Sequence, residues 1–295
     1  MRTEATGRRA VAVVVLAAGH GRRLGAAGGP GPKWLIEVEG APIAERHLTA
    51  IEQALGPGTR VVVVAGYAAE RVERYCEART ERSALRPQVV LNDGHAERNN
   101  WYSLLVGLDA LEGTLRDEDV VVVLNSDLFG LPIWLESLLA AAAELDGVPG
   151  FLAVDVVRPL TSEAMKVAAG PIDAVGRRWC TDIGKVGVAD PIGEYVGMAA
   201  LGSSARSLLH DTLRAFDGKD DRVDAWYEGA IQEASAVSPF LVVWPTPSSE
   251  WVEVDDAADL HLAERLALTG VTDPATDRAP APRPPVRPDR SSRGS

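Results

Sequence analysis

A glycine-rich, basic segment follows the first apolar run of the chain, and its residue types suit the binding of an anion. Residues 16–34 read LAAGHGRRLGAAGGPGPKW and contain no acidic side chain. Gly19 and Gly21 have no Cβ, so backbone N–H groups there can approach a phosphate closely. Arg23 and Lys33 add positive charge, and an arginine can hold a phosphate through two parallel hydrogen bonds. The segment matches neither the P-loop nor the dinucleotide-binding pattern, so by itself it is equally compatible with a solvated surface loop.

Two aspartates further along the chain stand where they could face this segment. Asp127 follows the apolar run Val120–Leu124, and Asp255 follows another apolar stretch. If both runs are strands, both carboxylates can reach the same rim of a sheet. Each aspartate also has a structural alternative, because Asp127 could cap a turn and Asp255, next to Asp256, could cap the final helix.

The elements that must position these residues alternate between strand and helix. Continuous β-branched runs are typical of strands buried on both faces of a parallel sheet, and strand–helix alternation implies right-handed crossovers. We therefore predict an α/β fold, a three-layer α/β/α sandwich with a Rossmann-like, mostly parallel mixed sheet. The predicted strands are 11–16, 60–65, 120–124, 151–157, 165–168, 195–201 and 240–244, and the predicted helices are 43–55, 68–79, 100–111, 131–145, 203–216, 222–234 and 257–268.

The net charge and the composition of the chain limit the classes of partner that it can bind. The 295 residues carry a formal net charge of −12, which argues against general binding to nucleic acid or to an anionic membrane. No run is long enough to span a bilayer, and the two cysteines are far apart, so we expect a cytoplasmic protein without disulfides. We expect a flexible N-terminus (1–9), one domain (10–268) and a disordered, Pro/Arg-rich tail (269–295). A homodimer is left open.

Several short strings resemble one enzyme family. Residues 16–24 with Pro32-Lys33 resemble the L-A-A-G-x-G-x-R-L…P-K signature of nucleotidyltransferases that make sugar nucleotides and CDP-alcohols. Further strings resemble bacterial phosphocholine and phosphonate cytidylyltransferases, and these are Asn92-Asp93, Asn99-Asn100-Trp101-Tyr102-Ser103-Leu104, Asn125-Ser126-Asp127, Met165-Lys166-Val167, Ile183-Gly184-Lys185, Gly193-Glu194-Tyr195-Val196-Gly197 and Trp251-Val252-Glu253-Val254-Asp255 with Asp259-Leu260. The resemblance covers roughly residues 10–268 and implies a sheet of the nucleotide-diphospho-sugar transferase type, with a nucleotide half (about 10–145) and an acceptor half (about 146–268).

The resemblance implies Mg²⁺-dependent transfer of CMP from CTP to phosphocholine or a similar small phospho- or phosphono-alcohol, with release of pyrophosphate. Two polyanions must meet in such a reaction, so cations and positioning dominate the catalysis. By resemblance Lys33 and Arg23 are catalytic, and Asp127 and Asp255 hold Mg²⁺. The nucleotide would be bound by Leu16, Ala17, Ala18, Gly19, Gly21, Asn99, Asn100 and Ser103.

The acceptor side is less well defined. Lys166 and Lys185 are candidates for the acceptor phosphate and equally for exposed strand lysines. A quaternary ammonium is bound by aromatic faces with a nearby carboxylate. Such a cage could be built from Trp101, Tyr195, Trp226 and Tyr227 with Glu194 and Glu228. For each aromatic residue taken alone, core packing is favoured.

Two other functions are weighed against this reading. A sugar-1-phosphate nucleotidyltransferase using UTP or dTTP would share the first loop, but a glycine–threonine pair is expected where this chain has Asn99 to Ser103. A non-catalytic nucleotide-binding module would retain the fold and lose functional residues. Lys33, Asp127 and the glycine pair are all present, which favours an enzyme.

Overall fold

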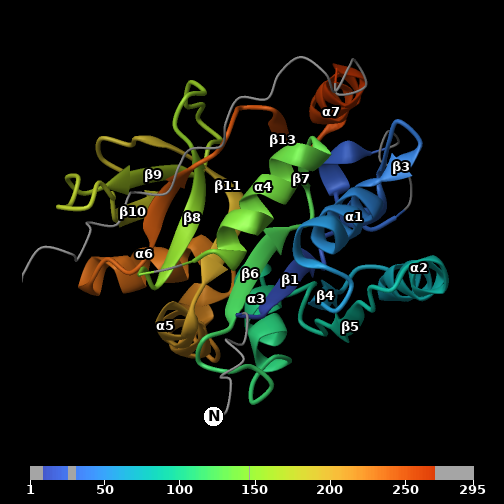
Figure 1. Cartoon of the computed structure of the whole chain (residues 1–295), viewed down its shortest axis with the longest axis horizontal. Coiled ribbons are helices and arrows are strands. Elements are labelled where there is room, and N and C mark those ends of the chain that lie inside the picture. The colour runs from blue at the N-terminus through green and yellow to red at the C-terminus, as the bar shows by residue number, and fades with distance from the viewer. Residues whose placement is uncertain (1–8, 26–30, 146, 270–295) are drawn as a thin grey trace, which may run out of the picture.

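A mixed sheet crosses the middle of the computed structural model, which describes residues 9–25, 31–145 and 147–269 (Figure 1). In this part of the chain the sheet has nine strands in the order β10-β9-β11-β6-β1-β4-β5, and β8 and β12 branch from β11. The strands are β1 (Val11–Ala17), β4 (Arg60–Ala65), β5 (Gln88–Leu91), β6 (Val120–Asn125), β8 (Gly150–Asp155), β9 (Lys166–Ala169), β10 (Cys180–Gly184), β11 (Gly193–Leu201) and β12 (Val242–Pro245).

The valine-rich strands form the parallel centre of this sheet. β1 lies between β4 and β6 and is parallel to both, and β5 adds a fourth parallel strand at the edge. Alternate side chains point to opposite faces, so Val13 packs in one core and Val14 in the other. Both valines are fully buried, as expected for a sheet that is covered on both sides.

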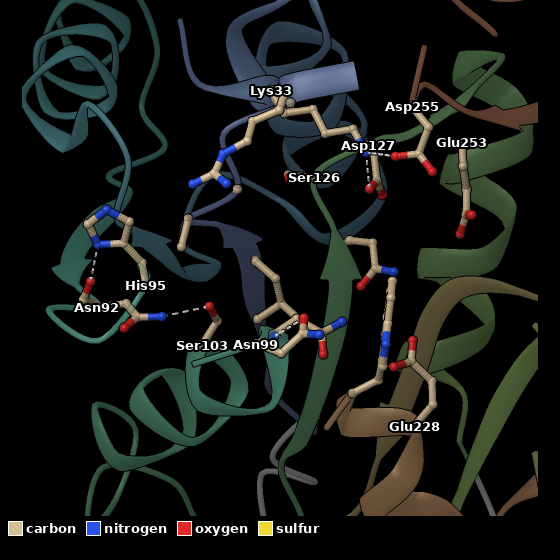
Figure 2. Close-up of a pocket in the computed structure, with 18 of the residues that line it drawn as sticks. Lys33, Asn92, His95, Asn99, Ser103, Ser126, Asp127, Glu228, Glu253 and Asp255 are labelled. Carbon is tan, nitrogen blue, oxygen red and sulfur yellow. Dashed lines mark hydrogen bonds and ion pairs between the residues drawn. The ribbon is translucent and has the colours of Figure 1, made fainter. Parts of the chain in front are cut away.

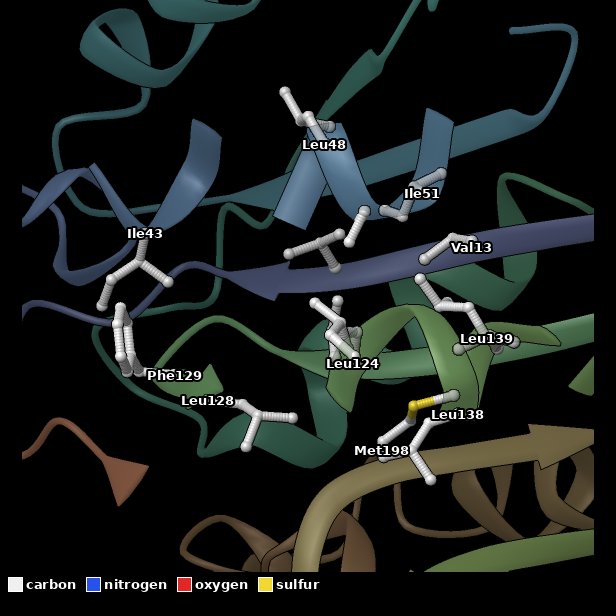
Figure 3. Packing of buried hydrophobic residues seen from close by; sticks show 14 of the residues in the cluster. Val13, Ile43, Leu48, Ile51, Leu124, Leu128, Phe129, Leu138, Leu139 and Met198 are labelled. Atoms are coloured by element: carbon white, nitrogen blue, oxygen red, sulfur yellow. The ribbon is translucent and has the colours of Figure 1, made fainter. Parts of the chain in front are cut away.

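Helices cover both faces, which confirms the predicted three-layer α/β/α architecture. The described helices are α1 (Ile43–Leu55), α2 (Ala69–Arg82), α3 (Asn100–Asp109), α4 (Pro132–Ala143), α5 (Ser203–Arg214), α6 (Tyr227–Val237) and α7 (Ala257–Thr269). Figure 3 shows Leu48 and Ile51 of α1 and Leu138 of α4 packed over strand residues such as Leu124. α2 and α7 contribute to the same cluster, whereas α3, α5 and α6 pack on the opposite face.

The close approach of α3 to the sheet depends on Gly107. A Cβ at this position would overlap the Val14 Cγ1 atom of β1 and approach Val64 Cγ2 of β4 to 3.1 Å. The glycine therefore lets the helix lie directly on the parallel strands, with its first residues at their carboxyl ends. These are the ends at which open α/β sheets bind ligands.

Two short antiparallel ribbons were not predicted. β2 (Glu37–Val38) pairs with β3 (Ala41–Pro42), and β7 (Leu128–Gly130) pairs with β13 (Trp251–Glu253). The edge strand β5 and strand β10 were also missed, because both are short and carry exposed or polar residues. The predicted helix 222–234 begins later, at Tyr227, since residues 220–222 form a separate 3₁₀ turn.

Some predictions lie outside the described residues or stay predictions. The flexible N-terminus 1–9 falls almost entirely on residues 1–8, and the tail 269–295 on residues 270–295, and neither range is described. The division into nucleotide and acceptor halves remains a prediction. Within the described ranges no helix is long and apolar enough to cross a membrane, and Cys76 and Cys180 are free and buried.

Candidate active site

A pocket of about 330 Å³ opens at the carboxyl ends of β1, β5 and β6 (Figure 2). Its lining includes most of the predicted nucleotide and metal residues together with several that were not predicted. The lining residues are Leu16, Ala18, Gly19, Gly21, Arg22, Arg23, Lys33, Asn92, His95, Arg98, Asn99, Asn100, Ser103, Asn125, Ser126, Asp127, Met165, Lys185, Trp226, Glu228, Glu253 and Asp255. Ala17 is buried in β1 and does not line it.

The loop after β1 turns at Gly21, whose φ of 68° is in the left-handed region. A short 3₁₀ turn follows, and after the undescribed residues 26–30 a second one begins at Lys33. The backbone N–H of Lys33 donates to Gly19 O at 3.3 Å, so the loop returns to its own start. Lys33 is thereby brought to the mouth of the sheet, with only 8% of its surface exposed.

Lys33 lies between the two aspartates that were predicted to face it. Its Nζ donates to Asp127 Oδ2 at 2.7 Å and also to Asp255 Oδ1. Arg23 Nη2 donates to Asp255 Oδ2 at 2.7 Å. Burial disfavours the charged ammonium, but the two carboxylates raise the pKa of Lys33 above its ordinary value. Burial acts against Asp255 in the same way, and Lys33 with Arg23 nevertheless holds its pKa below the ordinary value.

The β7–β13 ribbon explains how residues so distant in sequence meet. Glu253 is paired with Leu128, and Val254 N donates to Asp127 O at 3.0 Å, which sets Asp255 beside Asp127. Asp155 at the end of β8 accepts a hydrogen bond from Trp251 Nε1 at 2.8 Å and so fixes the start of β13.

The buried side chain of His47 links the segment that carries Lys33 to the segment that carries Asp127. Trp34 Nε1 donates to His47 Nδ1 at 3.2 Å, so the other ring nitrogen, Nε2, carries the proton and donates to Leu128 O at 2.6 Å. Trp34 follows Lys33 and Leu128 follows Asp127 in the sequence. Burial lowers the pKa of His47 to about 4, which keeps the ring neutral.

Asn92 and Ser103 form the wall of the pocket opposite the acids, as Figure 2 shows. Asn92 Nδ2 donates to Ser103 Oγ at 2.9 Å, and its own N–H donates to Ala65 O at 2.7 Å. The Asn92 side chain is buried, and Oδ1 has no partner among the described residues. A buried acceptor without a donor is costly, so this oxygen is suited to accept from a ligand.

The neighbouring asparagines use their side chains to hold the segment before α6. Asn99 Oδ1 caps α3 by accepting from Asn100 N at 2.7 Å, and Asn99 Nδ2 donates to Asp224 O at 3.0 Å. Asn100 Oδ1 accepts from Tyr227 N at 2.9 Å. We call these contacts the α3–α6 clasp. Asn99 and Asn100 therefore line the pocket while their side chains already have partners.

Two further carboxylates face the pocket. Glu228, the second residue of α6, is buried, and burial together with the Asp127 charge raises its pKa to about 7 against hydrogen bonds that include one from Asn100. Glu253 has its pKa raised well above the ordinary value by burial and by the charges of Asp127 and Asp255.

The predicted acceptor lysines differ in position. Lys185 lines the pocket, where its Nζ lies 4.8 Å from the centre of the Trp226 ring and 3.6 Å from Glu163 Oε2. Lys166 lies outside the lining and donates to three carbonyls, those of Ser162, Ala164 and Lys185. Glu194 is half-buried outside the lining, and burial raises its pKa.

The structure does not bring the aromatic cage together. Trp101, Tyr195 and Tyr227 are at most 2% exposed and none of them lines the pocket. The two tyrosine hydroxyls bond to each other at 2.9 Å, and that of Tyr227 also donates to Asn125 Oδ1 at 3.1 Å. These rings pack in the core beneath the pocket, and only Trp226 reaches it, with 43% of its surface exposed.

The acids fit a divalent cation of the magnesium type. Asp127 Oδ1 is buried without a partner among the described residues, although Oδ2 is bound by Lys33. Mg²⁺ is commonly held by one or two carboxylates, with substrate phosphates and water completing its shell. In the described ranges no cluster of three or more histidine, cysteine or acidic side chains with metal-binding geometry occurs. A cation here would be held by Asp127 and Asp255 and would depend on the substrate for further ligands.

Sequence reasoning missed several lining residues, chiefly Asn92, His95, Arg98, Asn125 and Glu253. Asn92 is the first residue after β5, and this position at a strand's carboxyl end was a usable signal. Asn92, Asn125 and Glu253 all lie in strings that resemble the family, but the resemblance implied no role for them.

The fold and the pocket together define a class of proteins that bind a nucleoside triphosphate at the carboxyl edge of an α/β sheet. Comparison with known proteins agrees with this class. Residues 13–221 match the model of the MobA-like NTP transferase domain, and the chain belongs to this nucleotidyltransferase family.

Curated relatives and solved structures give finer comparisons. The chain is 30% identical over 264 residues to the CMP-5'-(3-aminopropyl)phosphonate synthase of Streptomyces rubellomurinus, covering 86% of this chain and 38% of the relative. It is 28% identical over 268 residues to the bifunctional IPC transferase and DIPP synthase of Rubrobacter xylanophilus, covering 89% of this chain and 53% of the relative. The chain thus spans about half or less of these relatives' lengths.

The inositol-1-phosphate CTP transferase of T. maritima superposes with a TM-score of 0.65 at 19% identity, covering 88% of this chain and 97% of that one. The CTP:phosphocholine cytidylyltransferase of Streptococcus pneumoniae superposes with a TM-score of 0.64 at 17% identity, covering 88% and 99%. At these identities the superpositions establish the fold alone.

Proposed function

We propose that this protein is a Mg²⁺-dependent cytidylyltransferase that transfers CMP from CTP to a small phosphorylated or phosphonylated alcohol or amine and releases pyrophosphate. The observation that carries the proposal is the position of Lys33 between Asp127 and Asp255, within hydrogen-bond reach of both in one pocket. The name of one curated relative, a CMP-phosphonate synthase, supports a reaction that transfers CMP.

The chemistry requires neutralisation more than acid–base catalysis. An oxygen of the acceptor phosphate or phosphonate attacks the α-phosphorus of CTP, the bond from this phosphorus to the α–β bridging oxygen breaks, and pyrophosphate leaves with the electron pair. Lys33 and Arg23 would neutralise charge on the phosphates as it develops. Mg²⁺, when held by Asp127 and Asp255, would supply further positive charge to the triphosphate.

The opposite wall is suited to the base. Asn92 Nδ2 donates one of its two hydrogens to Ser103, and the buried Oδ1 has no partner among the described residues, so this oxygen can accept from a cytosine amino group. Phosphocholine as the particular acceptor has less support than the transfer itself, because the aromatic cage expected for it does not form at the pocket.

The test is pyrophosphate release from each nucleoside triphosphate with Mg²⁺ and a panel of acceptors, including phosphocholine, phosphoethanolamine, 2-aminoethylphosphonate, an inositol phosphate and glucose-1-phosphate. We expect release with CTP and a small phospho- or phosphono-compound. Release only with UTP or dTTP and a hexose-1-phosphate would refute the proposal in favour of a sugar nucleotidyltransferase.

The assignment of Asp127 as a ligand of Mg²⁺ is tested by a substitution of this residue. Asp127→Asn should lower turnover by about 10³-fold, because it removes one of the two acids that would hold the cation beside the triphosphate. The protein should stay folded, since the substitution also removes a charge that repels Glu228 and Glu253. Near-normal turnover in this variant would contradict the assignment.

A further inference from the structure

Glu228 is a buried carboxylate to which the proposed transfer reaction gives no task. Only 3% of its surface is exposed, it lines the pocket, and its Oε2 atom has no hydrogen-bond partner among the described residues. In the same ranges no lysine, arginine or histidine forms an ion pair with it. Hydrogen bonds such as the one from Asn100 reach the Glu228 carboxylate, but a buried carboxylate is normally satisfied at both oxygens, so Oε2 still lacks a donor.

We propose that Glu228 binds a primary ammonium group of the acceptor, which makes the preferred acceptors aminoalkyl phosphates and phosphonates. This inference rests on the proposed cytidylyl transfer, and it adds both the class of acceptor and the residue that selects it.

The position of Glu228 places its ligand on the acceptor side. Figure 2 shows Glu228 apart from Asn92 and Ser103, across the pocket from the wall that is suited to the base. Trp226 at the start of α6 and Lys185 line the same pocket, and the Lys185 Nζ atom lies 4.8 Å from the centre of the Trp226 ring. Lys185 can meet the acid end of a short acceptor while Glu228 meets the other end.

The charge of the site favours a cation over a neutral group. Burial disfavours the ionised form of Glu228, and the Asp127 carboxylate adds repulsion. The start of α6 stabilises a carboxylate only modestly, through the helix dipole and the N–H groups of the first turn. A ligand ammonium would supply both the positive charge and the N–H donor that Oε2 lacks.

The residues that line the pocket favour a primary ammonium over a trimethylammonium group. A trimethylammonium group has no N–H and is recognised by several aromatic faces together. Trp101, Tyr195 and Tyr227 are packed in the core, and of the four aromatic candidates for the cage only Trp226 lines the pocket, where its ring already lies beneath the Lys185 ammonium. The unpartnered oxygen of Glu228 instead requires a donor, which a primary ammonium provides three times over.

The experiment compares three phosphate monoesters that differ only at the far end: phosphoethanolamine, phosphocholine and ethyl phosphate. Binding to the full-length protein is measured by calorimetry with Mg²⁺ and an uncleavable CTP analogue in which a methylene group replaces the α–β bridging oxygen, and kcat/KM is measured separately from pyrophosphate release with CTP. The series is repeated with Glu228→Gln, which removes the charge and keeps the shape, and with Glu136→Gln as a matched control, since Glu136 lies on α4 outside the pocket lining.

We expect the wild-type protein to bind phosphoethanolamine about 10- to 100-fold more tightly than ethyl phosphate or phosphocholine, as one charge-assisted hydrogen bond would give. Glu228→Gln should remove that preference, while Glu136→Gln should retain it. The preference of the wild-type protein tests the proposal even if Glu228→Gln fails to fold.

Equal binding of the three compounds by the wild-type protein, or binding of none, would overturn the proposal. So would an unchanged preference in Glu228→Gln, or a loss of CTP affinity in this variant as large as the loss for phosphoethanolamine, which would assign Glu228 to the nucleotide. Ammonium-dependent binding without pyrophosphate release would refute the proposed transfer reaction and leave the Glu228 assignment standing.

Discussion

Replacement of Lys33 by methionine should cost both stability and turnover, and the two losses should respond differently to pH. The lysine ammonium contacts two aspartates whose side chains are 23% and 26% exposed. Removing one member of a fully buried pair costs about 3–5 kcal/mol. Water reaches both carboxylates here and Arg23 still pairs with Asp255, so we expect a smaller loss of about 1–3 kcal/mol at neutral pH.

For a domain of this size the loss corresponds to a fall in Tm of about 3–10 °C, measurable by calorimetry. Lys33 and Arg23 lower the pKa of Asp255 in the folded protein. This contribution to the free energy of unfolding is therefore present above the ordinary value of 3.8 and is lost as the pH falls through the lowered value. The Tm difference between Lys33→Met and the wild-type protein should accordingly hold from pH 6 to 8 and shrink below about pH 4.

Turnover should fall by about 10²- to 10³-fold at every pH, because a group that neutralises the transferring phosphate is gone. Lys33→Arg, which keeps the charge, should recover most of the stability and part of the activity. Lys219→Met, at an exposed position, serves as the matched control and should leave Tm nearly unchanged. An unchanged Tm at pH 7 in Lys33→Met, or retained turnover, would refute this account of the lysine.

Two further variants test Asn92, which lines the pocket, and His47, which is buried outside the lining. Asn92→Ala should weaken CTP binding by about 5- to 30-fold in calorimetry, since it deletes an acceptor that is held in place by Ser103, and unchanged affinity would separate Asn92 from the base. The neutral His47 should make the wild-type protein lose up to about 3 kcal/mol of stability as the pH falls from 6.5 to about 4, because only the unfolded histidine takes up a proton there. His47→Gln should flatten this part of the profile of Tm against pH, and a profile that is identical in the variant would contradict the pKa assigned to His47.

The parallel centre of the fold could be predicted because its signals are local. Runs such as 11–16 and 120–124 are mostly valine and wholly apolar, as expected for strands that are buried on both faces. The β7–β13 ribbon could not be predicted, because each strand has three residues and exists only through its pairing across the sequence. Such pairings depend on tertiary packing, which propensity does not report.

The candidate site likewise contains residues whose positions could be predicted from the sequence and residues whose positions depend on tertiary packing. Lys33 and the two aspartates were predicted to face each other, and they are in contact. Asp127 follows β6, which the pattern locates, whereas Lys33 and Asp255 were placed chiefly by the strings that resemble the family. The aromatic residues could not be placed from the sequence as a cage, because composition does not distinguish a ring that faces a pocket from one that is packed in the core. Trp226 and Tyr227 are adjacent in the sequence and have opposite environments, which the turn into α6 decides.

The α3–α6 clasp ties the two walls of the pocket into a single frame. The Asn99 side chain donates to the backbone of Asp224, and the Asn100 side chain accepts from the backbone of Tyr227. The start of α3 and the start of α6 therefore cannot move apart without breaking these hydrogen bonds. A substitution in the α3–α6 clasp would disturb the binding of both the nucleotide and the acceptor. Kinetic defects measured there would therefore report the spacing between the substrates rather than a contact with either one.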